Sequence, residues 1–119
     1  MVRAVVRVVD AVLTGRCTLI TSQVLLDELR RVVAYPKLAR VFPDPHEIVR
    51  LVADIAEMSY PKRAVQTVSD EADNRILEAA VASGCDYIVT GDAGLLALGD
   101  FEGIPVVAPA VFSSLLPSG

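Results

Sequence analysis

Apolar positions recur along the chain with two spacings, one typical of helices and one typical of strands. Segments such as VRAVVRVVDAVLTG, SQVLLDELRRVVA and DEADNRILEAAVASG repeat their apolar residues at the helical period, which indicates helices with one buried face. The short apolar runs CTLIT, DYIVT and IPVVA lie between helical segments and are typical of buried strands. The pattern predicts helices at 2–15, 22–34, 45–56, 70–84, 93–98 and 110–116, and strands at 17–21, 86–90 and 104–108.

Glycine, serine and proline residues set the expected ends of these elements. Gly15 stops the first helix, and Ser22 can cap the second, which ends at Tyr35-Pro36. The segment LARVFPDPHE is expected to be a loop because it holds two prolines. Pro61 limits residues 58–68 to one short edge strand at most.

The alternation of helices and strands determines the expected fold class. Strands that are separated by helices need crossover connections, so their pairing is parallel. A chain of 119 residues with 53% hydrophobic content is long enough for one core and too short for two ordinary domains. The sequence therefore predicts a single α/β domain over residues 1–119 with a short parallel sheet.

Composition excludes several classes of protein. No apolar run approaches the ~20 residues of a membrane span, and Arg3, Arg7 and Asp10 interrupt the first segment, so neither a membrane helix nor a signal peptide is expected. We expect a cytoplasmic protein in which Cys17 and Cys85 are reduced thiols. The net charge of -4 argues against general coating of nucleic acid and fits a site that gathers carboxylates around a cation.

One candidate site residue follows directly after an apolar strand. In DYIVTGD, Asp92 comes just past the predicted strand, and ligand sites of parallel α/β sheets lie beyond the carboxyl ends of strands. Gly91 allows a sharp turn there, and the Thr90 hydroxyl can orient a neighbouring carboxylate. The alternative is that Asp92 only caps a short helix beginning near Ala93.

A second candidate lies on the predicted helix 22–34. Glu28 falls at the border of the apolar face, whereas Arg30 and Arg31 point away from it. A carboxylate turned inward needs a cation or hydrogen-bond donors, because burial without a partner costs several kcal/mol. The alternative is that Glu28 pairs with an arginine at the surface.

The third group of candidates begins the helix DEADNRILEAAVASG. Asp70 and Asp73 lie in its first turn, where the helix dipole alone favours negative charge. Since helices follow strand ends in this architecture, that turn faces the same edge of the sheet as Asp92. Three carboxylates gathered there would repel each other unless a hard divalent cation lay between them, and Mg²⁺ or Mn²⁺ would suit the hydrolysis of phosphodiesters.

These residues resemble the PIN-domain ribonucleases, in particular the bacterial and archaeal toxin components of toxin–antitoxin modules. The resemblance covers nearly the whole chain. LITSQVLLDELRRVVAYPKL is similar to the family's strand, serine-capped helix and inward glutamate, and SDEADNRILEAAVASGCDYIVTGD to its acidic helix start and its strand ending in TGD. LLALGDFEGIPVVAPAVF is similar to its C-terminal strand and helix.

The resemblance implies a fold, an activity and partners. The fold would be a three-layer α/β/α domain, and the activity metal-dependent endoribonuclease cleavage of RNA, with a cognate antitoxin protein as partner. By this resemblance, three acidic residues would bind Mg²⁺ or Mn²⁺, and two hydroxyl side chains and a further aspartate would support these ligands. The metal-binding acids would be Glu28, Asp73 and Asp92, and the supporting residues Ser22, Thr90 and Asp70.

The chain departs from the family pattern at two places. The family often has an aspartate where this chain has Gly94, and it begins with a strand ending in Asp-Thr-Asn, a motif that is missing here. Asp10 does not replace that motif, because CTLIT follows too soon for the crossover of about a dozen residues that a parallel pair needs. We therefore expect an N-terminally incomplete domain that lacks its central strand, self-associates into homo-oligomers and cleaves RNA slowly or not at all.

Other classes of function remain open at this stage. A catalytically weak PIN-like module would bind an antitoxin or a second copy of itself and would not need the full set of acids. A phosphorylation-dependent receiver domain also clusters aspartates on a parallel sheet, but it needs a lysine beyond a later strand, and the lysines here are Lys37 and Lys62. Dinucleotide binding is disfavoured because no GxGxxG follows a strand.

Overall fold

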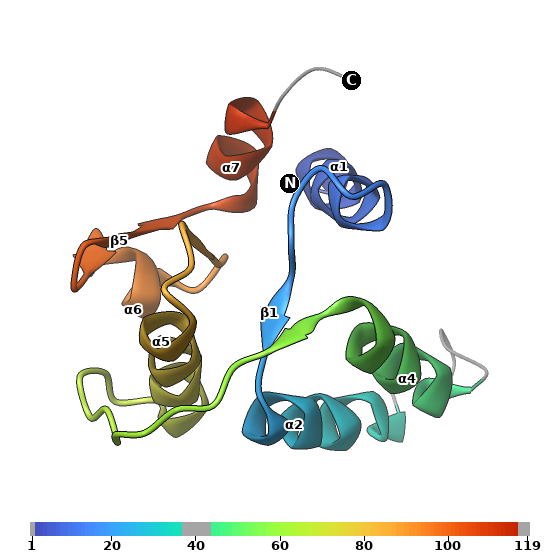
Figure 1. The fold of residues 1–119 in the computed structure, drawn as a ribbon, viewed down its shortest axis with the longest axis horizontal. Coiled ribbons are helices and arrows are strands. Elements are labelled where there is room, and N and C mark those ends of the chain that lie inside the picture. Colours follow the sequence, from blue (N-terminus) through green and yellow to red (C-terminus); the bar gives the residue numbers. More distant parts are fainter. Residues whose placement is uncertain (1, 37–43, 117–119) are drawn as a thin grey trace.

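The computed structural model describes residues 2–36 and 44–116, in which helices alternate with very short strands (Figure 1). The architecture is mixed α/β, as the alternation of patterns predicts. The helices are α1 (Val2–Leu13), α2 (Gln23–Val33), α4 (Pro45–Ile55), α5 (Glu71–Ser83), α6 (Ala93–Leu96) and α7 (Pro109–Leu115). The strands are β1 (Ile20–Thr21), β2 (Glu57–Met58), β3 (Ile88–Val89), β4 (Asp100–Phe101) and β5 (Ile104–Val107).

The helices begin and end where the sequence indicates. The Leu25 N–H donates to Ser22 Oγ over 3.3 Å, so Ser22 caps α2 as predicted. Helix α5 ends at Gly84, whose φ of 64° is the left-handed conformation that glycine adopts most easily. The predicted strands are longer than β1, β3 and β5, because only a few residues of each apolar run find a paired neighbour. Most of the predicted loop LARVFPDPHE lies outside the described residues.

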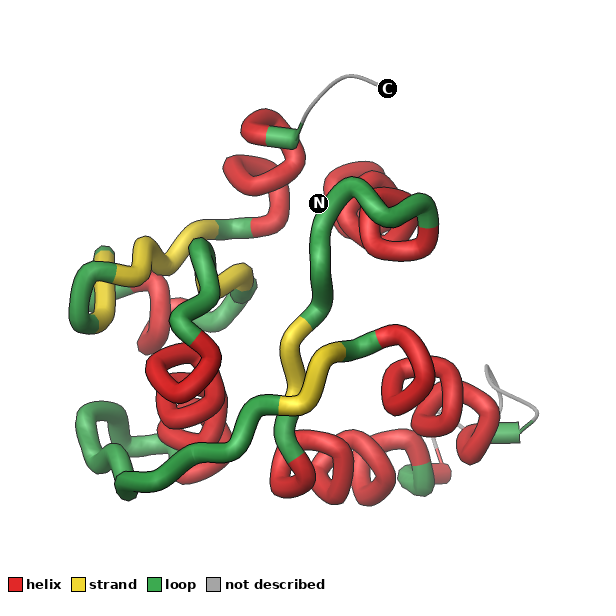
Figure 2. Tube along the Cα trace, in the orientation of Figure 1, coloured by secondary structure: helices red, strands yellow, loops and turns green. Residues whose placement is uncertain are grey.

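The described strands form two separate sheets instead of the one parallel sheet that the sequence predicts. β1 pairs with β2 in parallel, and β3 pairs with β5 in parallel, but no described strand joins β1 to β3 (Figure 2). β4, which the sequence pattern does not reveal, pairs antiparallel with β5. The tight turn between them is made by Glu102 and Gly103, both with positive φ, at 49° and 86°.

The main core lies between α5 and the sheet of β3, β5 and β4. Leu77 of α5 and Leu95 of α6 are fully buried in it, and burial of such side chains is the main source of stability. A second contact joins α2 and α4, and Leu26 and Val33 of α2 and Val49 of α4 are buried. The buried members of the main core are Val65, Leu77, Ala80, Ile88, Leu95, Ile104 and Val106.

Helix α5 connects the two sheets. It contributes Leu77 and Ala80 to the main core and also contacts β1. The Ser59 hydroxyl, just after β2, donates to the Ala79 carbonyl of α5 over 2.8 Å in a buried hydrogen bond. At the opposite end of the molecule, α1 packs beside α7 (Figure 1).

No described helix combines the length and the hydropathy that crossing a bilayer requires.

Candidate functional site

Asp92 lies just beyond β3, at the N-terminus of α6. Its carboxylate Oδ2 accepts a hydrogen bond from the Leu95 N–H over 2.9 Å, so it caps the short helix. Thr90 Oγ1 accepts from the Asp92 N–H over 3.0 Å, which sets the turn that orients this carboxylate. A Cβ at Gly94 would lie 3.0 Å from Asp92 Oδ2, so glycine leaves room for the carboxylate in this position.

Asp70 and Asp73 lie at the N-terminus of α5. Asp70 is the N-cap, and its Oδ1 accepts hydrogen bonds from Ala72 N–H over 2.8 Å and from Asp73 N–H over 3.4 Å. The capping interaction and the helix dipole explain why Asp70 is stable there without any ligand. Asp73 is partly buried, and its carboxyl group lies close enough to that of Asp92 for the two groups to interact directly.

The Asp73 carboxyl group has an unusual electrostatic environment. Partial burial raises its pKa above the ordinary 3.8, and the negative charges of Asp70 and Asp92, together with the hydrogen bond to Asp92, raise it further. No described arginine or lysine forms an ion pair with these three aspartates. Within the part of the chain that the structure describes, the acid cluster of Asp70, Asp73 and Asp92 therefore has no ion pair with a basic side chain.

Asn74 fixes the loop that leads into α5. This side chain is fully buried, and its Oδ1 accepts hydrogen bonds from the N–H groups of Thr67 and Val68 over 3.1 and 3.0 Å. Its Nδ2 donates to the Val68 carbonyl over 2.8 Å. The neutral amide thus satisfies three backbone groups next to the acid cluster, a role that the sequence pattern of the helix does not reveal.

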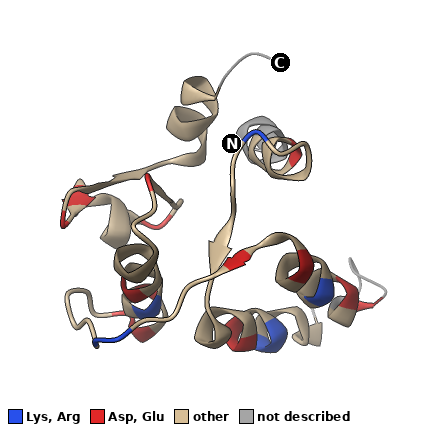
Figure 3. Cartoon of the chain, in the orientation of Figure 1, with Lys and Arg blue, Asp and Glu red and all other residues tan. Residues whose placement is uncertain are grey.

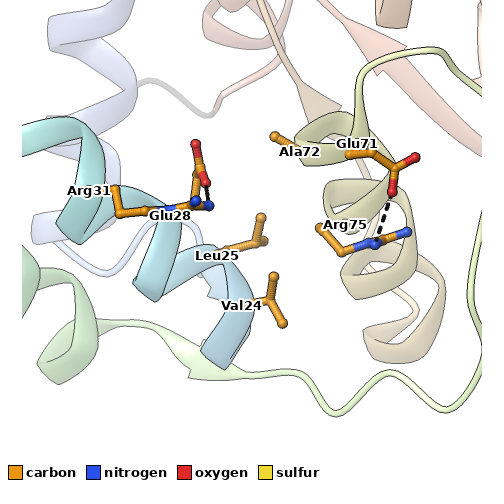
Figure 4. Close-up of a pocket in the computed structure, with 7 residues that line it drawn as sticks. All are labelled: Val24, Leu25, Glu28, Arg31, Glu71, Ala72 and Arg75. Carbon is orange, nitrogen blue, oxygen red and sulfur yellow. Dashed lines mark hydrogen bonds and ion pairs between the residues drawn. The ribbon is translucent and has the colours of Figure 1, made fainter.

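Glu28 faces the acid-bearing end of α5 across a cleft of about 220 Å³ (Figure 4). Its carboxylate forms an ion pair with Arg31, one turn further along α2. Arg31 is exposed, as expected for a residue that points away from the apolar face, and it meets Glu28 because residues three apart on a helix are neighbours. The structure therefore has the second alternative, in which Glu28 pairs with an arginine.

Arg75 lies opposite Glu28 in the same cleft, on α5. Its guanidinium group forms ion pairs with Glu78 over 2.9 Å and with Glu71 over 3.4 Å, and it donates to the Val65 carbonyl over 3.1 Å. Its Nε is buried without a partner among the described residues. The helical pattern did not single out Arg75, although its position one turn after Glu71 is a signal of an i,i+4 ion pair.

The structure brings Asp73 and Asp92 into contact, with Asp70 beside them, and places Glu28 across the cleft from Ala72, the neighbour of Asp73. Among the described residues, no group of three acidic, histidine or cysteine side chains is arranged to hold a metal ion. Acidic and basic side chains lie on α2, α4 and α5 and in several loops, whereas β5 and α7 carry no charge (Figure 3).

The raised pKa of Asp73 predicts that removing its carboxyl group stabilises the folded protein at neutral pH. The folded protein binds the Asp73 proton more tightly than the unfolded chain does, so its contribution to the free energy of unfolding falls as pH rises above 3.8 and is unfavourable at neutral pH. With chelator present, Asp73→Asn should therefore be more stable than the wild type at pH 7, and this advantage should shrink toward pH 4. Urea titrations at pH 7 and pH 4 measure the free energy of unfolding of both proteins.

Asp54→Asn is the matched control for this measurement, because Asp54 is exposed on α4, away from the acid cluster. It removes the same formal charge and should shift the urea midpoint little at either pH. An Asp73→Asn variant that was less stable than the wild type at pH 7 would contradict the assigned electrostatics.

Comparison with known proteins adds one match. The sequence model of the family described as PIN domain matches residues 2–94. Searches among curated proteins and among solved structures gave no significant match. The matched span contains Glu28, Asp70, Asp73 and Asp92, and it covers most of the chain. The chain therefore belongs to the PIN-domain family, whose members are generally nucleases.

Proposed function

We propose that the protein is a divalent-metal-dependent ribonuclease that hydrolyses phosphodiester bonds of RNA at the acid cluster. The observation that carries this proposal is the contact between Asp73 and Asp92, two carboxylates whose repulsion no described arginine or lysine relieves. Membership in a family of nucleases supports it. A cation is the simplest ligand that would stabilise both carboxylates in their charged form.

The residues present fit such a cation. Mg²⁺ is commonly bound by one or two carboxylates together with waters and substrate phosphates, so Asp73 and Asp92 suffice as protein ligands, and Glu28 and Asp70 would act from further away. The bound cation would supply an activated water and would stabilise the negative charge that develops on the phosphate oxygens. Thr90 and the cap to Leu95 hold Asp92 in place, and Asn74 holds the loop before Asp73.

Two arginines are positioned to contact the substrate. Arg31 and Arg75 line opposite sides of the cleft next to the acid cluster. Each is already paired with a glutamate, Glu28 or Glu71, which fixes its position without removing all of its donors. We assign to them the binding of RNA phosphates, which a protein of net charge -4 needs locally.

Cleavage of single-stranded RNA should require Mn²⁺ or Mg²⁺ and should stop when chelator is added. The same ions should raise the melting temperature of the wild-type protein, because a ligand that binds only the folded state stabilises it. Fluorescently labelled RNA and thermal unfolding measure the two effects. Cleavage that persists in chelator, together with a melting temperature unaffected by millimolar Mn²⁺, would rule out the proposal.

A catalytically weak binding module is the second candidate. It is favoured by the pairing of Glu28 with Arg31 and by the lack of a complete three-ligand metal site among the described residues. Metal binding and RNA binding without turnover would identify it. A toxin role, a cognate antitoxin and self-association remain predictions from the resemblance.

A further inference from the structure

The segment that joins β2 to α5 (Figure 1) contains a run of exposed residues, which we call the 60–64 loop. They are Tyr60, Pro61, Lys62, Arg63 and Ala64. Ser59 before this loop and Val65 after it are both buried. The 60–64 loop therefore projects from the surface between two buried residues.

Hydrogen bonds attach both ends of this loop to neighbouring residues of α5. The Ser59 hydroxyl donates to the Ala79 carbonyl over 2.8 Å, and the Val65 N–H donates to the Glu78 carboxylate over 2.8 Å. The Ser59 N–H also donates to the Thr21 carbonyl of β1 over 2.7 Å. Loops that are held on a scaffold in this way commonly carry binding residues, because the scaffold fixes the direction of their side chains.

The end of the loop at Val65 lies next to the cleft that contains Glu28. Arg75 Nη2 donates to the Val65 carbonyl over 3.1 Å, and Arg75 lines that cleft together with Arg31. Lys62 is three residues before Val65, so at most about 11 Å separate their Cα atoms. A strand of RNA that left the cleft at Arg75 would therefore meet the 60–64 loop.

Tyr60 is the aromatic residue of this loop. Its exposed fraction of 74% is the largest among the large hydrophobic side chains that the structure describes, and its ring contacts no other aromatic ring in the described part of the chain. A single exposed ring is common on protein surfaces, but here two basic residues follow within three positions. An exposed aromatic face on which a base can stack, next to cations that bind phosphate, is the usual arrangement in proteins that bind single strands.

The charges around the loop leave one cation available for a phosphate. Arg63 forms an ion pair with Glu102 in the turn between β4 and β5, whereas Lys62 forms none among the described residues. Two further acids lie nearby: Glu78 is mostly buried and already paired, and Glu57 is exposed on β2, three residues before Tyr60 in the chain. Lys62 is therefore the residue of the loop that can bind a phosphate without giving up another ion pair.

We propose that the 60–64 loop binds single-stranded RNA beside the cleft, with one base stacked on Tyr60 and one backbone phosphate bound by Lys62. The choice of RNA rests on the proposed function, and the inference narrows the substrate to RNA with unpaired bases. A duplex does not fit this loop, because its bases are stacked on each other and have no face left for a tyrosine ring.

The probe for this proposal is a fluorescein-labelled oligoadenylate of about ten nucleotides, within the range that single-strand-binding domains cover. Fluorescence anisotropy in chelator measures its Kd without cleavage. Tyr60→Ala should weaken binding by about tenfold, and Tyr60→Phe should bind like the wild type because it keeps the ring. An abasic oligomer of the same length should bind the wild type and Tyr60→Ala equally, because it has no base to stack.

Lys62→Gln tests the phosphate contact separately. It should reduce the slope of log K against log salt concentration by about 0.7, the value expected for one phosphate contact on a single strand, with either oligomer. Tyr35→Ala and Arg50→Gln are matched controls, because they change an exposed tyrosine after α2 and an exposed arginine on α4. Both should leave binding unchanged, and all of these variants should keep the melting temperature of the wild type.

Several outcomes would overturn the proposal. These are the absence of RNA binding, a Tyr60→Ala variant that binds as well as the wild type, and an equal loss of binding in Tyr35→Ala. Weaker self-association of Tyr60→Ala in light scattering, with unchanged affinity for RNA, would assign the loop to a protein contact instead.

The same experiments distinguish this inference from the proposed nuclease function. Binding that depends on Tyr60, without cleavage in Mn²⁺ or Mg²⁺, would contradict the nuclease function and leave the RNA-binding loop in place. Metal-dependent cleavage by a protein whose binding does not depend on Tyr60 would contradict only the role of the loop.

Discussion

Asp92→Asn is expected to lower the rate of metal-dependent RNA cleavage by about a hundredfold or more, which corresponds to about 2.7 kcal/mol of lost transition-state stabilisation. The substitution removes one of the two carboxylates in contact at the acid cluster, and with it the charge that would hold a cation. The helix cap should survive, because an asparagine side-chain oxygen can still accept the hydrogen bond from Leu95. The variant therefore tests the role of the carboxylate in cleavage without a loss of folding.

Binding of Mn²⁺ provides a readout that needs no turnover. Asp92→Asn and Asp73→Asn should both abolish the rise in melting temperature that Mn²⁺ causes in the wild type. Asp54→Asn, which removes an exposed charge on α4, should retain both cleavage and the response to Mn²⁺. Full cleavage and a normal Mn²⁺ response in Asp92→Asn would mean that the acid cluster is not the active site.

Asn74→Ala is expected to lower the free energy of unfolding by about 3 kcal/mol, because it leaves buried backbone groups of Thr67 and Val68 without partners. For a domain of this size, the melting temperature should fall by about 10 °C. Thermal and urea unfolding measure the change. The loop before α5 should also lose protection against amide exchange.

Two further variants test the cause of this loss. Gln66→Ala truncates an exposed amide in the same loop and should change stability little. Asn74→Asp keeps an acceptor for Thr67 and Val68 but loses the donor to the Val68 carbonyl, so it should be less stable than the wild type. If Asn74→Ala were as stable as Gln66→Ala, the hydrogen bonds of Asn74 would not hold the loop.

The helices could be predicted from the sequence because the residues that start and end a helix act locally. Ser22 marks the start of α2 through its own side chain, and the structure confirms this predicted cap. Asp70 and Gly84 lie at the two ends of the predicted helix 70–84, where the structure has the N-cap and C-cap of α5. The separation of β1 and β3 into two sheets could not be predicted in this way. Pairing between strands depends on which segments lie side by side in space, and residues 17–21 carry the same apolar pattern whether or not a neighbour pairs with them.

The acid cluster shows the same contrast. The position of Asp92 after an apolar strand and of Asp73 in a first helical turn indicates a shared edge of the sheet, and the structure places their side chains in contact. For Glu28 the sequence left two alternatives, and the structure has the one in which this carboxylate pairs with an arginine at the surface, Arg31. Asn74 was missed because a buried amide inside a helical pattern has no distinct period.

The arrangement of strand pairs also has a consequence for the order of folding. Ile88 pairs with Val106, and Phe101 with Ile104, so the sheet of β3, β5 and β4 closes only short loops. The pairing of Ile20 with Glu57 closes a longer loop and is completed by the contact of Ser59 with α5. Because closing longer loops costs more chain entropy, the C-terminal half should act as the nucleus on which the β1–β2 pair assembles later.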